Sequence, residues 1–142
     1  MNDETAGNCH ETARIELKSE LLHAEITRVI IECFFAVYNK LGFGFLENVY
    51  CGALMLELKR RGHKVAREVL VPVLYEGVQI GRYKMDFIVD DLVVVEVKSG
   101  AVLGPTDRRQ VLNYLRATEL EVGLLLHFGP APKFYRVASL NC

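Results

Sequence analysis

The sequence lacks any long hydrophobic run. No uncharged stretch reaches the roughly 18 residues that a transmembrane helix needs, so we expect no membrane span. The first twenty residues are polar and acidic and have no apolar signal-peptide core, which favours a cytoplasmic location. Internal repeats and linkers are also absent. The 142 residues therefore predict one domain over 23–142, preceded by a polar segment, 1–22, that is loosely ordered or a short helix.

A strong net charge is absent as well. Lys and Arg number 17 against 18 Asp and Glu, which leaves a net charge of −1. Nucleic-acid binding would therefore have to rest on local basic patches. Two basic groups are candidates, although both also fit an ordinary solvated surface: Lys59, Arg60, Arg61, Lys64 and Arg67 near one helix end, and Arg108 with Arg109 near another.

Cysteine is sparse. The four cysteines form no C-x-x-C pair and no zinc-like spacing, which argues against a zinc or iron–sulfur site. Cys33 and Cys51 fall among apolar helix residues, so we expect small buried thiols. The four histidines show no ligand spacing either, and we expect them to be structural or surface residues.

The chain does contain clear periodic patterns. Apolar residues recur at helical spacing, then alternate in Val-rich segments, which predicts eight elements in the order α-α-β-β-β-α-β-β. Helices are expected at 23–41, 46–61 and 106–118. Strands are expected within 64–98, with turns at 76–77 and 90–91, and at 121–129 and 133–140, the last at a sheet edge. This order predicts an α/β fold with a mixed sheet flanked by helices.

The apolar run 92–98 carries two charged residues, Glu96 and Lys98, which a strand places on the same face. Charges in such a strand are costly unless they are paired, solvated or bound to a metal. The position of Asp86, on the preceding strand, depends on the turn. A two-residue loop sets Asp86 opposite Val95, whereas a three-residue loop or a bulge sets it opposite Glu96. A shared site requires the second arrangement.

Two carboxylates held together repel each other, and a hard divalent cation such as Mg²⁺ relieves that repulsion. Lys98 would then orient a water or balance charge on a phosphate. In the alternative interpretation, Asp86 only ends its strand, while Glu96 and Lys98 form an ordinary ion pair on a solvated face. The valines around Glu96 favour the metal site, because they are typical of a strand covered on both faces.

This Asp…Glu-x-Lys arrangement within an α-β-β-β-α-β core resembles the PD-(D/E)XK nuclease superfamily. Gly44, Glu47 and Tyr50 form a Gly-x-x-Glu-x-x-Tyr string that resembles the signature of the GxxExxY proteins, a group within that superfamily. Gln110 and Tyr114, in the following helix, are similar to the Gln/Tyr motif of RecB-like nucleases. Residues four apart share a helix face, so both side chains are expected to point at the site.

The resemblance covers roughly residues 26–137 and implies a restriction-endonuclease-like fold. It implies metal-dependent hydrolysis of nucleic-acid phosphodiesters, with DNA favoured over RNA and Mg²⁺ or Mn²⁺ as the cofactor. The implied metal ligands are Asp86, Glu96 and the carbonyl of Val97, with Glu47 assisting directly or through water. The implied catalytic residues are Glu47, Asp86, Glu96, Lys98, Gln110 and Tyr114.

Plainer interpretations exist for several of these residues. Glu47 in the first turn of its helix would stabilise the helix dipole by less than about 1 kcal/mol. Tyr114 would be a core aromatic, with Gln110 as its exposed neighbour. For the whole chain, the alternatives are a catalytically silent nuclease-fold module that binds nucleic acid or a protein, and a homodimer formed through a self-pairing edge strand at 133–140.

Overall fold

A computed structural model gives the structure, which describes residues 22–140. Eight elements follow one another in the order expected from the sequence. The helices are α2 (Ala24–Leu41), α3 (Glu47–Arg60) and α4 (Pro105–Thr118). The strands are β1 (Val65–Tyr75), β2 (Val78–Val89), β3 (Val93–Ser99), β4 (Val122–Phe128) and β5 (Pro132–Ala138). The predicted polar segment lies almost wholly outside the described residues, as do Cys9 and Cys142.

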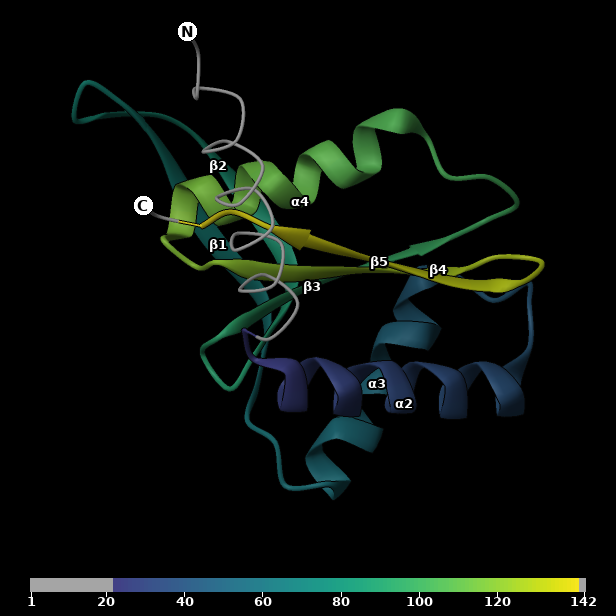
Figure 1. Cartoon of the computed structure of the whole chain (residues 1–142). Helices are drawn as coiled ribbons and strands as arrows, with labels where there is room; N and C mark the ends of the chain where they lie inside the picture. Colours follow the sequence, from purple (N-terminus) through teal and green to yellow (C-terminus); the bar gives the residue numbers. More distant parts are fainter. Residues whose placement is uncertain (1–21, 141–142) are drawn as a thin grey trace, which may run out of the picture.

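The five strands form one sheet in the order β1-β2-β3-β4-β5. Only β3 and β4 run parallel, while the other neighbours are antiparallel, so the sheet is mixed as predicted. Helix α4 covers one face, whereas α2 and α3 cover the other (Figure 1). The last strand, β5, lies at a sheet edge as expected. Among the described residues, no helix has the length and apolar character needed to cross a membrane.

Two clusters of buried side chains form the core, one on each face of the sheet. The larger packs α2 and α3 against the sheet and includes Phe34, Tyr50 and Phe87. The smaller lies beneath α4 and includes Val94 and Tyr114. The predicted buried thiols, Cys33 and Cys51, are both found in the larger cluster.

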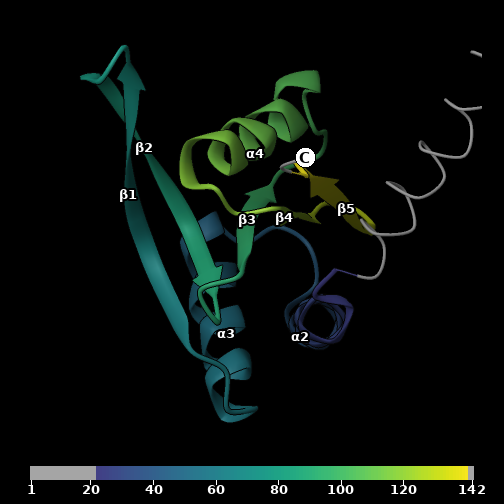
Figure 2. The same ribbon diagram turned by 60° about the vertical axis from the view of Figure 1, so that its left-hand side comes forward.

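Strand β2 changes the face that it presents at Asp86. Phe87 packs in the larger cluster, but Met85, two residues away, packs in the smaller one. Alternate residues of a regular strand share a face, so the strand must twist between these two positions. The pairing with β1 skips Glu68 and Asp86, and Glu68 has a positive φ of 55°. Figure 2 shows the β1–β2 hairpin leaving the plane of the other strands and extending past α4.

Candidate active site

The turn between β2 and β3 decides which residue lies opposite Asp86. Val89 pairs with Val93, so three residues, 90–92, connect the two strands. Pairing continues to Phe87–Val95, and the same register brings Asp86 opposite Glu96. Asp90 and Asp91 both adopt left-handed backbone angles, with φ of 52° and 58°, which tighten this connection. The structure therefore has the three-residue alternative, the one that a shared site requires.

Asp86 is held by the backbone of the neighbouring strand. Its Oδ2 accepts a hydrogen bond from the N–H of Val97 at 2.8 Å. The backbone pairing of β2 with β3 ends at Phe87–Val95, so the Asp86 carboxylate takes the place of the next backbone acceptor. The N–H and C=O of a strand residue point to the same side, so the Val97 carbonyl also faces the fork where β2 leaves β3.

Glu96 is the most unusual carboxylate of the described chain. It is only 5% exposed, and it faces α4 together with Val94, two residues before it. Its Oε1 lies 3.5 Å from Nζ of Lys98, but its buried Oε2 has no hydrogen-bond partner within residues 22–140. Burial and then the negative charge of Asp86 raise the pKa of Glu96 to about 8, against the opposing effect of Lys98. An ion pair is present, but it is not on a solvated face.

Glu47 is the first residue of α3 and approaches the site from the other face of the sheet. The residue as a whole is exposed, yet partial desolvation of its carboxyl group raises its pKa. The negative charges of Asp86 and Asp107 act in the same direction, while Lys98 opposes them. Glu47 therefore lies within electrostatic reach of the carboxylate and ammonium groups at the fork.

Tyr50 fixes the loop that leads into α3. It is fully buried, and its hydroxyl donates to the carbonyl of Gly42 and accepts from the N–H of Phe45 at 3.2 Å. Gly44, with a φ of 115°, supplies the backbone conformation that this loop needs. The three residues of the Gly-x-x-Glu-x-x-Tyr string thus form one local unit: Gly44 turns the chain, Tyr50 ties the loop, and Glu47 starts the helix.

The two motif residues of α4 have different surroundings. Tyr114 is 2% exposed, packs in the core cluster beneath α4, and donates a 3.4 Å hydrogen bond to the carbonyl of Lys84. Burial, followed by the charges of Glu96 and Asp86, raises its pKa. Tyr114 is packed as a core aromatic, and its hydroxyl is bonded to the backbone of β2. Tyr114 therefore supports the site by packing β2 against α4.

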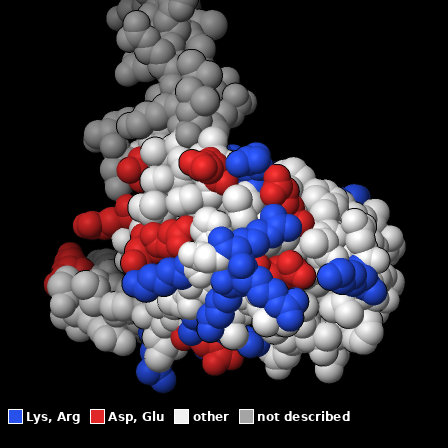
Figure 3. All heavy atoms as spheres, turned by 90° about the horizontal axis from the view of Figure 1, so that it is seen from below, with Lys and Arg blue, Asp and Glu red and all other residues white. Residues whose placement is uncertain are grey.

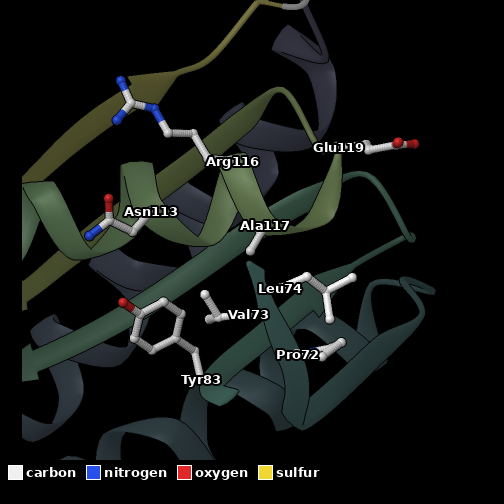
Figure 4. A pocket seen from close by; sticks show the side chains of 8 residues that line it. All are labelled: Pro72, Val73, Leu74, Tyr83, Asn113, Arg116, Ala117 and Glu119. Carbon is white, nitrogen blue, oxygen red and sulfur yellow. The ribbon is translucent and has the colours of Figure 1, made fainter. Parts of the chain in front are cut away.

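Gln110 lines a groove of about 350 Å³ between α4 and β2, together with Tyr83, Arg109 and Asn113. A second groove of about 540 Å³ shares Tyr83 and Asn113 and continues along the hairpin, where Val73 lies on its wall (Figure 4). Gln110 therefore remains accessible from solvent, unlike Tyr114.

The residues at the fork fit a divalent metal ion held by two protein carboxylates. No group of three His, Cys, Asp or Glu side chains within residues 22–140 is arranged to hold a metal, so Glu47 does not complete a three-acid cluster with Asp86 and Glu96. Mg²⁺ commonly uses one or two carboxylates and keeps several waters. Two carboxylates of that kind are available, Asp86 and Glu96 with its unpartnered Oε2, and the Val97 carbonyl is directed toward the fork.

The expected basic residues lie partly near this site and partly away from it: Arg109 lines the groove with Gln110, and Arg67 pairs with Phe87, next to Asp86. Figure 3 shows that lysine and arginine gather, with acidic residues among them, on the face that carries α2 and α3. Arg61 pairs with Glu32 at 3.0 Å, and Lys64 pairs with Asp91 at 2.8 Å. These residues follow the C-terminal end of α3, about 20 Å along the helix from its first turn at 1.5 Å per residue. Arg108, on α4, stacks on Tyr135 at 3.6 Å from the ring centroid.

Comparison with known proteins agrees with this geometry. Residues 24–137 match the PD-(D/E)XK nuclease superfamily, and the chain belongs to that superfamily. The crystal structure of SSO0001 is similar, with a TM-score of 0.53 and 19% sequence identity. That similarity covers 67% of this chain and 52% of the other, so the chain spans about half of that protein's length, and the likeness shows the fold alone. No curated protein matches the sequence.

Membership in this superfamily, together with the mixed five-stranded sheet flanked by helices, establishes a restriction-endonuclease-like α/β fold. Nucleases of this superfamily generally use divalent metal ions. Sequence reasoning missed one feature of the site, a set of exposed apolar side chains, Phe43, Phe45 and Leu46, beside Glu47. The signal for it was present in the string "GFGFLE", where large apolar residues alternate with glycines that favour a turn.

Proposed function

We propose that this protein is a metal-dependent nuclease that hydrolyses phosphodiester bonds of nucleic acid, with DNA favoured over RNA. The supporting observation is the buried carboxylate of Glu96, which has one unpartnered oxygen and lies opposite the half-buried Asp86. A buried carboxylate without a hydrogen-bond partner is costly, and such groups concentrate at functional sites. A divalent cation would satisfy that oxygen and neutralise the repulsion.

In this proposal Asp86, Glu96 and the Val97 carbonyl hold Mg²⁺ or Mn²⁺, with Glu47 assisting through water. A bound ion supplies a Lewis acid that polarises the phosphate and lowers the pKa of a water. The ammonium of Lys98, which is about a quarter exposed, orients the attacking water and stabilises negative charge that develops on the phosphate.

Two residues of α4 have supporting roles. Gln110, accessible in its groove, contacts the substrate backbone or a carboxylate of the site. Tyr114 contributes as a positioning residue rather than by direct contact, because its hydroxyl binds the Lys84 carbonyl and packs β2 against α4.

Within the superfamily, we infer that the chain is one of the GxxExxY proteins. Both the sequence and the structure support this inference, since Gly44, Glu47 and Tyr50 act together in one loop and the helix that follows it. We also infer a single nuclease-like domain over residues 23–142. We infer a cytoplasmic location as well, and cell fractionation would test that location.

The test is divalent-dependent cleavage of single- and double-stranded DNA and RNA by the purified protein. Asp86→Asn and Lys98→Ala should each lower cleavage by at least about 100-fold, since each removes a group that acts in the transition state. Lys64→Ala, a surface lysine of the remote basic group, is the matched control and should cleave normally. Equal activity in the wild type and both site variants would exclude this site as the source of cleavage.

A second candidate is a catalytically silent module that binds nucleic acid or a protein. It is favoured by the absence of a three-acid metal cluster within residues 22–140 and by the net charge of −1. Isothermal titration with Mg²⁺ or Mn²⁺ near neutral pH separates the two candidates. Binding that Asp86→Asn abolishes supports the nuclease, whereas no binding by the folded protein supports the silent module.

A homodimer is the remaining partner proposal. Strand β5 lies at the edge of the sheet, and an exposed edge can pair with a second copy. Size-exclusion chromatography with light scattering tests this, because a dimer through β5 should be lost when a proline replaces an edge residue such as Tyr135. A monomer at all concentrations would rule it out.

A further inference from the structure

A short loop at the candidate site exposes large apolar side chains. We call residues 42–46 the phenylalanine loop. Within it Phe43 is 48% exposed, Phe45 is 45% exposed and Leu46 is 78% exposed, and Leu46 directly precedes Glu47. The connection from β3 to α4 adds another exposed apolar residue, Val102. Both connections lie at the end of the sheet where β3 and β4 finish (Figure 1).

The loop is fixed in place rather than loosely attached. The Tyr50 hydroxyl binds it at Gly42 and at Phe45, and the Phe45 ring packs edge-on against the Tyr50 ring at 6.0 Å. Gly42 and Gly44 have positive φ values of 70° and 115°. The backbone therefore holds Phe43 and Phe45 about half exposed, with the Phe45 ring also in contact with the buried Tyr50. Exposed large apolar side chains gathered in one short, fixed loop are typical of a binding surface.

The position of the loop limits what it can bind. A phosphodiester at Asp86 and Glu96 would lie beside Glu47, one residue from Leu46, so a neighbouring nucleotide reaches the phenylalanine loop. The faces of unpaired bases are flat and apolar, and they stack on aromatic side chains. A continuous duplex hides those faces and presents charged phosphates, which phenylalanine cannot bind favourably.

We propose that the phenylalanine loop stacks unpaired bases next to the phosphate bound at the site, so that the protein takes single-stranded or locally opened nucleic acid rather than continuous duplex. The proposal rests on the proposed nuclease function for the position of the phosphate. Charge supports the choice of ligand. The net charge is −1, and Arg61 and Lys64 are already paired with Glu32 and Asp91, so stacking adds to the affinity that the remaining basic residues supply.

Binding is measured with the full-length protein in EDTA, where cleavage does not interfere. The probe is a short single-stranded oligodeoxynucleotide that contains 2-aminopurine, compared with the same strand in a duplex. The chain contains no tryptophan, so Phe43→Trp introduces a single fluorescent reporter into the loop. Tyr75, 63% exposed at the far tip of the β1–β2 hairpin, provides the matched controls Tyr75→Ala and Tyr75→Trp.

The expected result is tighter binding of the single strand than of the duplex, with 2-aminopurine fluorescence quenched on binding. Phe43→Ala should weaken single-strand binding about 5- to 150-fold, while Tyr75→Ala leaves it unchanged. Phe43→Leu, which keeps apolar surface but loses the flat ring, should weaken binding as Phe43→Ala does. The tryptophan fluorescence of the Phe43→Trp variant should fall on adding the strand, and that of Tyr75→Trp should not.

Several results overturn the proposal. Equal affinity of Phe43→Ala and the wild type, full affinity of Phe43→Leu, or a preference for duplex each contradict stacking. Loss of a dimer in light scattering on Phe43→Ala, with unchanged oligonucleotide binding, would make the loop a protein interface instead. Failure of the nuclease proposal gives a different pattern: stacking persists, but Mg²⁺ or Mn²⁺ produces no cleavage of any substrate.

Discussion

The Asp86 carboxylate accepts a hydrogen bond from the Val97 N–H, 2.8 Å away, at the point where β2 stops pairing with β3. One oxygen of this side chain thus takes the place of a backbone acceptor in the sheet. The same carboxylate group lies opposite Glu96. The same bond orients a candidate metal ligand and holds the fork between the two strands. Several consequences can be measured directly.

Replacement of Asp86 should separate these two roles. Asp86→Ala leaves the Val97 N–H without its acceptor, and we expect the free energy of unfolding to fall by about 1–3 kcal/mol. Asp86→Asn keeps an oxygen acceptor and should lose less than half as much. Chemical denaturation at pH 5.5 is the measurement, because Glu96 is protonated there and its repulsion with Asp86 does not contribute. Equal losses in both variants would contradict a structural role for this hydrogen bond.

The raised pKa of Glu96 predicts a pH dependence of stability in the metal-free protein. Between its ordinary value of 4.5 and about 8, the folded protein holds a proton on Glu96 that the unfolded chain has lost. Stability contributed by this group is therefore present at low pH and decreases as the pH rises through that window. Relative to Glu96→Gln, the wild type should lose at least about 1 kcal/mol between pH 5 and pH 8.

Thermal unfolding of the wild type and Glu96→Gln across this pH range tests the assignment. The difference between their unfolding free energies should change with pH and level off above about pH 8. Glu76→Gln, at the exposed hairpin turn, is the control and should follow the wild type. A constant difference between the wild type and Glu96→Gln would mean that Glu96 titrates normally.

Tyr50→Phe should destabilise the protein through the phenylalanine loop. The substitution removes the hydroxyl that joins Gly42 to Phe45 but keeps the buried ring, which stacks on Phe128 at 4.1 Å. We expect a loss of about 1–3 kcal/mol, measured by urea denaturation. Faster hydrogen exchange should be confined to the loop and the first turn of α3. Tyr75→Phe, at an exposed position, should show neither change.

Two glycine substitutions should shift stability in opposite directions. A Cβ at Gly123, in β4, would lie 2.6 Å from Cγ1 of Val111 on α4, so Gly123→Ala should cost about 1–3 kcal/mol by overpacking. Gly52, inside α3, has nothing within 4 Å of an added Cβ. Gly52→Ala should stabilise the protein by about 0.5–1 kcal/mol. Melting temperatures of the two variants check both signs, and a neutral Gly123→Ala would show that α4 can move away from the sheet.

The sequence was sufficient to predict the elements, because helical spacing, strand alternation and glycine positions are local signals. It also limited the position of Asp86 to two alternatives. It did not choose between them, since Asp90 and Asp91 suit a turn of either length. The choice depends on the tertiary pairing of Val89 with Val93, which no local pattern encodes.

The face switch in β2 was also beyond sequence reasoning. It occurs opposite Glu68 of the partner strand, whose backbone is left-handed. A glutamate in a strand does not predict that conformation. The depth at which Tyr114 is buried could not be predicted for a similar reason. Spacing on a helix shows which residues share a face, but it does not show how deeply that face is covered, and Tyr114 is almost completely buried.

The three-residue connection between β2 and β3 has a consequence for how this chain can diverge. Surface loops usually tolerate gains and losses of residues, but here the loss of one residue would rotate Asp86 away from Glu96. Relatives that retain chemistry at the fork should therefore conserve the length of this turn more strictly than its composition. The length of this exposed turn should therefore distinguish relatives that keep an active site from relatives that have lost it.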